Sequence, residues 1–411
     1  MRLLLLFILV VSPVFADDTW PQFRGPKGTG ISKATGLPIT FDDKTNLVWK
    51  TPIHDKGWSS PVVLGKNIWL TTAKEDGTAQ YAVAIDRDSG KVVHDIKVFD
   101  TVKPPYFFIK EYNSHASPTP VVEAGKVYVH FGSTGTACLD AESGKILWTN
   151  RELRCDHWRA PGSSPILWND LLLVAFDGHD VQYVAALHKD TGKLAWRTDR
   201  SVDYKTTNGD LKKAYSTVSV IDVEGKPQAV SSCAAGTVAY DPQSGKELWK
   251  VEYAGMNAAT PPLFAFGLVY ITSGHTSKLY AVDPKGSGNV SKTNIKWELS
   301  NAPSRPAPIL LGDLLFLVND KGFASGHDAA TGKEIWRRRL MGSNFYSSPV
   351  IAGGHLYICD RDGKCHVLNA NREGELVATN TLEGGIEATP AIAGKSLYIR
   401  TGKFLYRFEK K

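Results

Sequence analysis

The chain has 411 residues, of which 42% are hydrophobic and 10% aromatic, and it contains 37 glycines and 22 prolines. This composition is typical of a turn-rich all-β protein and excludes a disordered or fibrous chain. The formal net charge is +6, but basic and acidic residues are interspersed along the sequence, so we predict no nucleic-acid partner.

Residues 1–16 have the pattern of an export signal. Arg2 precedes an apolar run from Leu3 to Val11, and Val14-Phe15-Ala16 suits a small-residue cleavage site. The apolar run is too short to cross a bilayer. The residue after the expected cut is Asp17 rather than a cysteine that a lipid would modify. We therefore expect a signal peptide, a periplasmic or otherwise exported protein, and no membrane anchor.

Residues 17–46 contain irregular sequence that is rich in glycine and proline. Residues 24–30, Arg-Gly-Pro-Lys-Gly-Thr-Gly, have the glycines of a phosphate loop but not its preceding strand, its following helix or its Gly-Lys-Ser/Thr order. We predict that residues 17–46 form an N-terminal clamp packed on the body of the protein. Leu47–Thr51 then has the pattern of the last strand of a unit whose first three strands are missing.

A four-strand unit recurs along the rest of the chain. Three short apolar runs are followed by a Ser/Thr-Gly-Lys turn and by a fourth run that ends in tryptophan. The turn and its tryptophan are complete at Gly144, Gly192, Gly245 and Gly332. The eight first strands begin near Ser60, Pro120, Ser164, Val218, Pro262, Pro308, Pro349 and Pro390.

The eighth unit ends near Phe404-Leu405-Tyr406 without a fourth strand, whereas Leu47–Thr51 is a fourth strand without a unit. A ring closed by strands from both ends of the chain explains both observations and leaves no open sheet edge. A four-strand repeat of this length is typical of a β-propeller blade. We predict one all-β domain over residues 47–411, an eight-bladed β-propeller of antiparallel blades. Five tryptophans should be buried between neighbouring blades: Trp148, Trp196, Trp249, Trp297 and Trp336.

The motif Asp-x-x-Ser/Thr-Gly-Lys-x-x-Trp resembles the pyrroloquinoline-quinone (PQQ) repeat, the tryptophan-docking blade, over roughly residues 47–408. Quinoprotein dehydrogenases and BamB, a non-enzymatic scaffold lipoprotein of outer-membrane protein assembly, share this repeat. The chain also looks like exported PQQ-like propellers that begin with Trp-Pro-x-Phe-Arg-Gly, as residues 20–25 do here. The resemblance implies the fold but no particular cofactor.

The dehydrogenases of this family hold PQQ beside a disulfide between adjacent cysteines and use calcium. This chain has five cysteines, and none of them are adjacent in the sequence: Cys138, Cys155, Cys233, Cys359 and Cys365. Cys359 and Cys365 flank a hairpin turn, so they either form a cross-strand disulfide or stay free. This departure from the family pattern disfavours PQQ.

Loops that enter each first strand should share one face with the loops between second and third strands. The longest of them, residues 99–117 and 198–215, flank the third unit. That unit supplies five candidate ligand-binding residues: His157, Arg159, Asp177, His179 and Asp180. Tyr106, Phe107, Phe108 and Tyr112 are candidates for an aromatic wall. In the alternative interpretation, the two aspartates cap turns and the other side chains pack locally.

One residue of each unit lies just before its first strand and should point toward the rim of the channel. These residues are Trp58, His115, His157, Tyr215, Asn257, Arg305, Tyr346 and Glu387. We take His115, Arg305, Tyr346 and Glu387 as further candidate ligand-binding residues. Such a ring suits a sugar, a peptide or a cofactor; the alternative is a rim that contacts only water.

The favoured function is that of an exported, non-enzymatic propeller which binds a protein or polysaccharide partner through this loop face, as the BamB scaffold does. One alternative is an oxidoreductase that depends on PQQ and calcium, and another is a carbohydrate-active enzyme. The sequence contains no nucleophile elbow, HExxH motif or Walker loop, so it identifies no catalytic residue and leaves enzymatic activity open.

Overall fold

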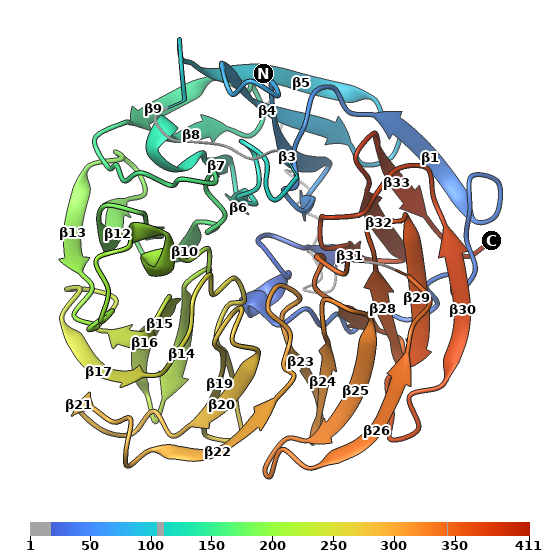
Figure 1. The fold of residues 1–411 in the computed structure, drawn as a ribbon. Coiled ribbons are helices and arrows are strands. Elements are labelled where there is room, and N and C mark those ends of the chain that lie inside the picture. Colours follow the sequence, from blue (N-terminus) through green and yellow to red (C-terminus); the bar gives the residue numbers. More distant parts are fainter. Residues whose placement is uncertain (1–17, 105–110, 343) are drawn as a thin grey trace, which may run out of the picture.

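The computed structural model describes residues 18–104, 111–342 and 344–411, which form a ring of eight β-sheets (Figure 1). The eight-bladed all-β propeller predicted from the repeats is confirmed. The predicted signal peptide and the aromatic residues Tyr106, Phe107 and Phe108 lie outside the described residues. No helix in the described ranges is both long enough and apolar enough to cross a membrane.

The first four sheets have the following strands, from the axis outward. They are β2 (Val62–Leu64), β3 (Asn67–Ala73), β4 (Ala79–Asp86) and β5 (Val92–Asp100); β6 (Val121–Glu123), β7 (Lys126–His130), β8 (Thr136–Asp140) and β9 (Ile146–Asn150); β10 (Ile166–Trp168), β11 (Leu171–Asp177), β12 (Gln182–His188) and β13 (Leu194–Asp199); and β14 (Ser219–Val223), β15 (Lys226–Cys233), β16 (Gly236–Tyr240) and β17 (Glu247–Glu252).

The remaining sheets follow the same order. They are β18 (Leu263–Ala265), β19 (Leu268–Thr272), β20 (Lys278–Val282) and β22 (Ile295–Ser300); β23 (Ile309–Leu311), β24 (Leu314–Val318), β25 (Phe323–Asp328) and β26 (Glu334–Arg339); β27 (Val350–Ala352), β28 (His355–Cys359), β29 (Lys364–Asn369) and β30 (Leu376–Thr381); and β31 (Ala391–Ala393), β32 (Ser396–Arg400), β33 (Phe404–Phe408) and β1 (Leu47–Pro52). The short β21 (Gly288–Asn289) pairs in parallel with β17 and adds a fifth strand to the fourth sheet.

The last sheet takes its outer strand from the other end of the chain. β1 pairs antiparallel with β33, so that Lys50 lies opposite Tyr406 and Pro52 lies opposite Phe404. This pairing confirms the predicted closure of the ring by the N-terminal strand.

The middle strands are buried on both faces because each sheet packs between two others. All seven residues of β11 are buried, whereas the outer strand β13 exposes most of its side chains. This difference explains why the second and third runs of the third unit are mainly apolar and its fourth run is mixed. The hydrophobic core therefore lies in the layers between neighbouring sheets.

The Gly-Lys turns join each sheet to the one before it. In the second sheet, Asp140 Oδ1 accepts hydrogen bonds from the backbone N–H (2.7 Å) and the hydroxyl (2.7 Å) of Ser143. In the third sheet, Gly192 adopts φ 70° and has no Cβ, so the indole of Trp148 packs directly on it. Trp148 Nε1 also donates to the backbone oxygen of Lys189 (2.8 Å). Of the five tryptophans predicted to be buried, Trp196 and Trp249 are buried, whereas Trp148, Trp297 and Trp336 are half-buried.

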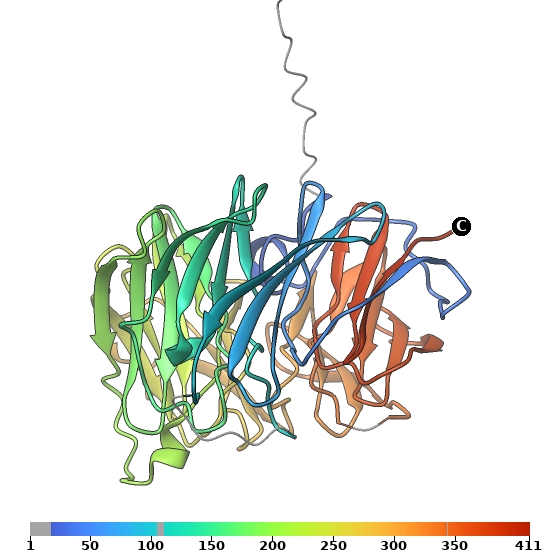
Figure 2. The ribbon, with the colours of Figure 1, turned by 90° about the horizontal axis from the view of Figure 1, so that it is seen from above.

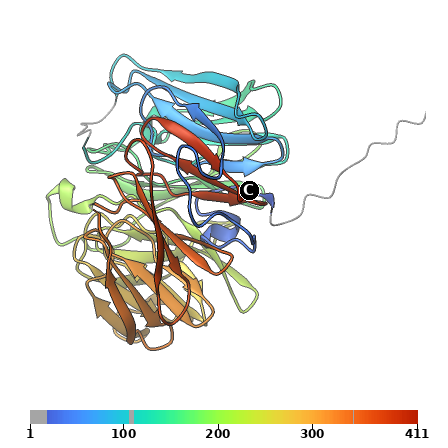
Figure 3. The same cartoon turned by 90° about the vertical axis from the view of Figure 1, so that its right-hand side faces the viewer.

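The short helix η4 (Gly209–Lys212) marks the loop face of the ring. Residues 18–46 cross the central channel on the other face (Figures 2 and 3). Trp20 pairs with Val63 of the first sheet, and Ile31 pairs with Ile351 of the seventh. Arg24 is fully buried, and its Nη2 donates to the backbone oxygen of Pro308 in the sixth sheet (2.8 Å). This segment therefore contacts sheets on both sides of the channel and obstructs it on the face opposite the loops.

Candidate functional site: a pocket on the propeller axis

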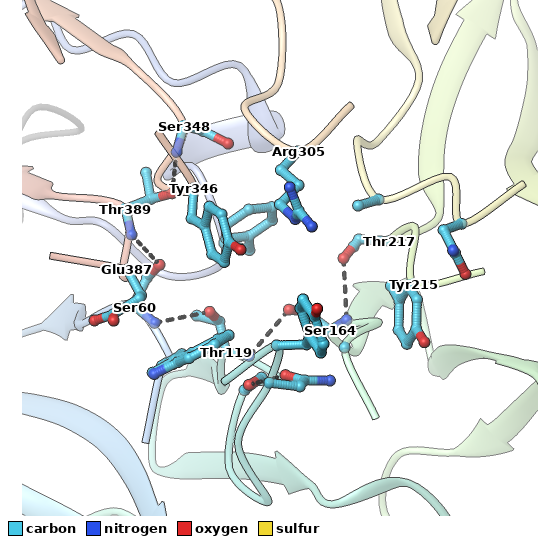
Figure 4. A pocket seen from close by; sticks show the side chains of 18 of the residues that line it. Ser60, Thr119, Ser164, Tyr215, Thr217, Arg305, Tyr346, Ser348, Glu387 and Thr389 are labelled. Carbon is cyan, nitrogen blue, oxygen red and sulfur yellow. Dashed lines mark hydrogen bonds between the residues drawn. The ribbon is translucent and has the colours of Figure 1, made fainter. Parts of the chain in front are cut away.

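A cavity of about 340 Å³ lies at the loop end of the channel (Figure 4). Side chains from all eight sheets line it, from Trp58 before the first sheet to Glu387 before the last. Phe23 of the N-terminal segment lines it as well. The cavity therefore lies on the axis of the ring, and the N-terminal segment contributes to its lining.

Six hydroxyl side chains form a belt around this pocket. Each accepts a hydrogen bond from the backbone N–H of the corresponding residue in the preceding sheet, as in Ser60 N to Thr119 Oγ1 (3.0 Å) and Thr389 N to Ser60 Oγ (3.1 Å). The belt consists of Ser60, Thr119, Ser164, Thr217, Ser348 and Thr389, and all six line the pocket. These bonds fix the oxygens in place and leave the hydroxyl protons directed at other acceptors.

The belt is interrupted because the fifth and sixth sheets supply no hydroxyl side chain to it. Pro261 and Ala307 occupy the corresponding positions there, and neither side chain has a hydroxyl group. Five of the six belt residues directly precede a proline, whereas Thr217 precedes Val218. The sequence prediction used these prolines to place the first strands and did not identify the hydroxyl residues before them as lining residues.

One wall of the pocket is a stack of aromatic rings and guanidinium groups. The Tyr346 ring packs against Arg305, whose guanidinium carbon is 4.3 Å from the ring centroid, and against Arg361 at 4.7 Å. Arg361 also pairs with Glu387 (Nε to Oε1, 3.1 Å). Trp58 meets Tyr346 edge-on, with 6.0 Å between the ring centroids. These contacts restrict the rotamers of long charged side chains at the rim.

The opposite wall contains Arg159, Tyr215, Asn257 and His275. Arg159 lies over the ring of Tyr112 (5.4 Å), which also lines the pocket. Burial lowers the pKa of His275, and the positive charge of Arg305 adds to this effect. The imidazole is therefore neutral at physiological pH.

Of the eight predicted rim residues, the structure places six in the pocket lining: Trp58, Tyr215, Asn257, Arg305, Tyr346 and Glu387. His115 and His157 are buried beside the pocket instead. His157 Nε2 accepts the backbone N–H of Ser133 (3.0 Å), and burial lowers the pKa of His157 to about 3. Burial also lowers the pKa of His115 to about 4.

The other candidates from the third sheet, apart from Arg159, lie outside the pocket lining. Asp177 is buried and forms a bidentate pair with Arg200 (2.9 and 2.7 Å). His179 stacks on Trp158, with 5.0 Å between the ring centroids. Asp180 Oδ1 accepts two backbone N–H groups, including that of Asp156 (2.7 Å). Asp180 therefore caps a turn, as the alternative interpretation of this cluster expected, whereas Asp177 pairs with Arg200, which neither interpretation predicted.

The pocket does not have the ligands that calcium requires. Calcium takes six to eight oxygen ligands with several carboxylates. Among the described lining residues the one carboxylate is that of Glu387, which pairs with Arg361. The described part of the chain also contains no group of three or more His, Cys, Asp or Glu side chains that could hold a metal ion.

The five cysteines are buried and free, and none of them lines the pocket. Cys359 of β28 lies directly opposite Cys365 of β29, so the hairpin expected from the sequence does bring this pair together. The two thiols are nevertheless not joined in a disulfide. No sulfur is therefore placed to cover a planar cofactor in the pocket, as the disulfide of the quinoprotein dehydrogenases would.

Known proteins similar to this chain include both assembly factors and enzymes. A family model described as outer membrane protein assembly factor BamB matches residues 37–210, 82–324 and 180–411. The BamB protein of Legionella pneumophila (strain Paris) is 24% identical over 239 residues, 58% of this chain and 48% of that protein. Tetrathionate hydrolase of Acidithiobacillus ferrooxidans is 22% identical over 384 residues, 84% of this chain and 72% of that protein. The match thus spans about half the length of the Legionella protein.

Among solved structures, the quinohemoprotein alcohol dehydrogenase of Comamonas testosteroni matches with a TM-score of 0.70 at 12% identity. The match covers 96% of this chain and 81% of that chain. At this identity the similarity shows the shared fold alone.

Proposed function

Because this chain belongs to the family described as outer membrane protein assembly factor BamB, we propose that it is an exported, non-enzymatic binding protein. Its partner is a protein or a polysaccharide, which it binds at the loop face over the central channel. The observation that carries this proposal is the axial pocket, to which all eight sheets contribute side chains. Pockets that combine aromatic surface with a few fixed polar groups are the usual form of a ligand site.

The polar groups of the pocket favour recognition over catalysis. The six belt hydroxyls bond to backbone N–H groups of neighbouring sheets, rather than being activated by a histidine or carboxylate. Arg361 is paired with Glu387, and Arg305 is packed on Tyr346. Fixed donors and aromatic faces of this kind bind a partner without changing it.

The runner-up function, an oxidoreductase that uses PQQ and calcium, receives less support from these residues. The pocket has one carboxylate where calcium needs several, and the cysteines lie elsewhere. Metal and quinone analysis of the exported protein, purified without added cofactor, distinguishes the two functions. Calcium and a quinone at close to one per chain would contradict our proposal.

Binding itself is tested by filling the pocket. Ala259 lines the pocket, so Ala259→Trp should abolish binding to immobilised polysaccharides or to outer-membrane polypeptides without removing a side-chain hydrogen bond. The matched control is Ala254→Trp at an exposed position outside the pocket lining. Binding that survives Ala259→Trp unchanged would exclude the pocket as the partner site.

A further inference from the structure

Two arginines of the pocket lie near carboxylates, but too far from them for short hydrogen bonds. Arg159 Nη2 is 3.7 Å from Asp210, and Arg305 Nη1 is 3.8 Å from Asp320. Charge-assisted hydrogen bonds are about 2.7–2.9 Å long, as in the buried pair of Arg200 and Asp177. Arg159 and Arg305 therefore keep donors for a ligand.

Three cations lie in or beside the pocket: Arg159 and Arg305 in its lining, and Lys213 next to Tyr215. The amine of Lys213 is buried 3.5 Å from the hydroxyl of Tyr215 and pairs with Asp210 at 2.5 Å. Arg305, Arg159 and Lys213 all lower the pKa of His275 after the larger effect of burial, although Asp320 opposes them. Burial raises the pKa of Tyr215, and the positive charges of Arg159 and Arg305 oppose this rise. The described lining of the pocket carries two arginines against one carboxylate, Glu387, so it favours an oxyanion.

Two buried polar atoms of residues that line the pocket have no hydrogen-bond partner in the described part of the chain. They are Arg159 Nε, a donor, and Asn257 Oδ1, an acceptor. Asn257 is 7% exposed and has φ 53°, and its side chain lines the pocket. A buried polar atom without a partner costs about 1–3 kcal/mol, so a ligand that supplies the partner is favoured.

The arginine donors and the Asn257 acceptor together limit which ligands can fit the pocket. The arginines need an anionic oxygen, whereas Asn257 Oδ1 needs a hydroxyl or N–H donor from the ligand. Inorganic phosphate or a simple carboxylate supplies too few such donors. A sugar acid carries a carboxylate and several hydroxyls on one ring, and the six belt hydroxyls are complementary to those hydroxyls. Trp58 adds an apolar face of the kind that sugar rings contact.

Building on the function proposed above, we propose that Arg159, Asn257 and Arg305 bind the carboxylate and a neighbouring hydroxyl of a uronic acid residue in an acidic polysaccharide. The cavity of about 340 Å³ is at the small end of the range for ligand pockets, about 300–1,000 Å³, and so suits a unit of this size. The partner of the protein is then a polysaccharide rather than a polypeptide.

The test is calorimetric titration of the full chain with three probes: an oligoglucuronate, the matching neutral oligoglucose and an N-acetylated dipeptide with a free carboxylate. We expect the oligoglucuronate to bind at least tenfold more tightly than the other two. Arg305→Gln and Asn257→Gly should each weaken its binding about tenfold. Glycine keeps the positive φ of position 257, so the fold is preserved.

Matched controls are Asn169→Gly and Arg337→Gln. Asn169 has φ 51° and is exposed in a turn, and Arg337 pairs with Glu334 on the outer strand β26. Neither substitution should alter oligoglucuronate binding. If oligoglucose binds as tightly as oligoglucuronate, the pocket has no carboxylate subsite. If the dipeptide binds as tightly as oligoglucuronate, the pocket does not recognise a sugar. If no saccharide binds but a polypeptide partner is still lost in Ala259→Trp, this inference fails and the proposed function stands.

Discussion

The indole of Trp49 lies against Gly90, and its Nε1 donates a 3.0 Å hydrogen bond to the backbone oxygen of Arg87. Trp49 belongs to β1 of the last sheet and Gly90 to a turn of the first sheet. The same contact joins the second and third sheets, where Trp148 packs on Gly192. The ring therefore closes through the same docking contact that it uses between blades continuous in sequence.

This contact predicts the cost of a methyl group at Gly90. Gly90 has φ 71° and a Cβ there would overlap the Trp49 indole, whereas Gly267 has φ 72° and nothing within 4 Å of its Cβ position. We expect Gly90→Ala to lower the free energy of unfolding by about 2–4 kcal/mol and Gly267→Ala by about 1 kcal/mol. Urea unfolding measures both. Equal losses would mean that the indole does not dock on the glycine.

The buried pair of Arg200 and Asp177 should be essential for stability. Their side chains are 0% and 1% exposed, and Arg200 also donates to Ser231 Oγ (2.9 Å). Arg200→Ala should cost about 3–5 kcal/mol because it leaves an uncompensated carboxylate inside the protein. Thermal and urea unfolding of the variant measure this loss.

Two comparisons make the effect of Arg200 specific. The double variant Arg200→Met with Asp177→Leu should recover most of the lost stability, because no charge then stays buried. Glu224→Ala, which breaks an exposed pair with Lys285, should change stability by less than about 1 kcal/mol. A double variant as unstable as Arg200→Ala would show that the ion pair is not the cause.

Buried histidines should make the protein sensitive to mild acid. Burial lowers the pKa of His130 and of His157 to about 3 each, from the ordinary value near 6.5. Both are neutral in the folded state, whereas both become charged below pH 6.5 once the chain unfolds. Their contribution is therefore complete above pH 6.5, and each loses about 1.4 kcal/mol per pH unit as the pH falls toward 3.

Urea unfolding at several pH values between 7 and 5 checks this slope. Replacing His130 and His157 with glutamine should flatten it, although the variant will be less stable at pH 7. His188→Gln, which replaces a half-exposed side chain at the end of β12, should leave the slope unchanged. A slope that persists in the double glutamine variant would assign the acid sensitivity to other groups.

The five thiols should be protected until the protein unfolds. All five are buried, and burial raises the pKa of Cys138 to about 12 and of Cys233 to about 11. A thiol reagent should therefore label none of them rapidly in the native state and all five in urea. Rapid native labelling would contradict their burial. A mass two daltons lower than expected would reveal an oxidised Cys359–Cys365 pair.

Much of the fold follows from periodic features of the sequence. The repeated Gly-Lys turn and its tryptophan predict each blade, and the unmatched strand at Leu47 predicts the closure. Because the register of each first strand fixes which residue precedes it, six of the eight rim residues were placed correctly. These features are predictable because the same local geometry recurs in every blade.

The remainder depends on partners that are distant in the sequence. The sequence gives no indication that Asp177 meets Arg200, which comes 23 residues later in a non-repeating loop. His157 satisfies the spacing of a rim residue, but its ring turns inward to Ser133. Phe23 lies in an aperiodic segment, so its place in the pocket lining could not be predicted.

The segment that carries Phe23 crosses the axis of the ring and contacts the first, sixth and seventh sheets, so it obstructs the channel on the face opposite the loops. A long linear molecule cannot be threaded through such a ring and can only insert one of its ends, while its inner monomers pass over the rim. The number of binding sites that a polymer offers would thus depend on its number of chain ends rather than on its mass. Cutting a polymer into shorter pieces would multiply its targets without adding material.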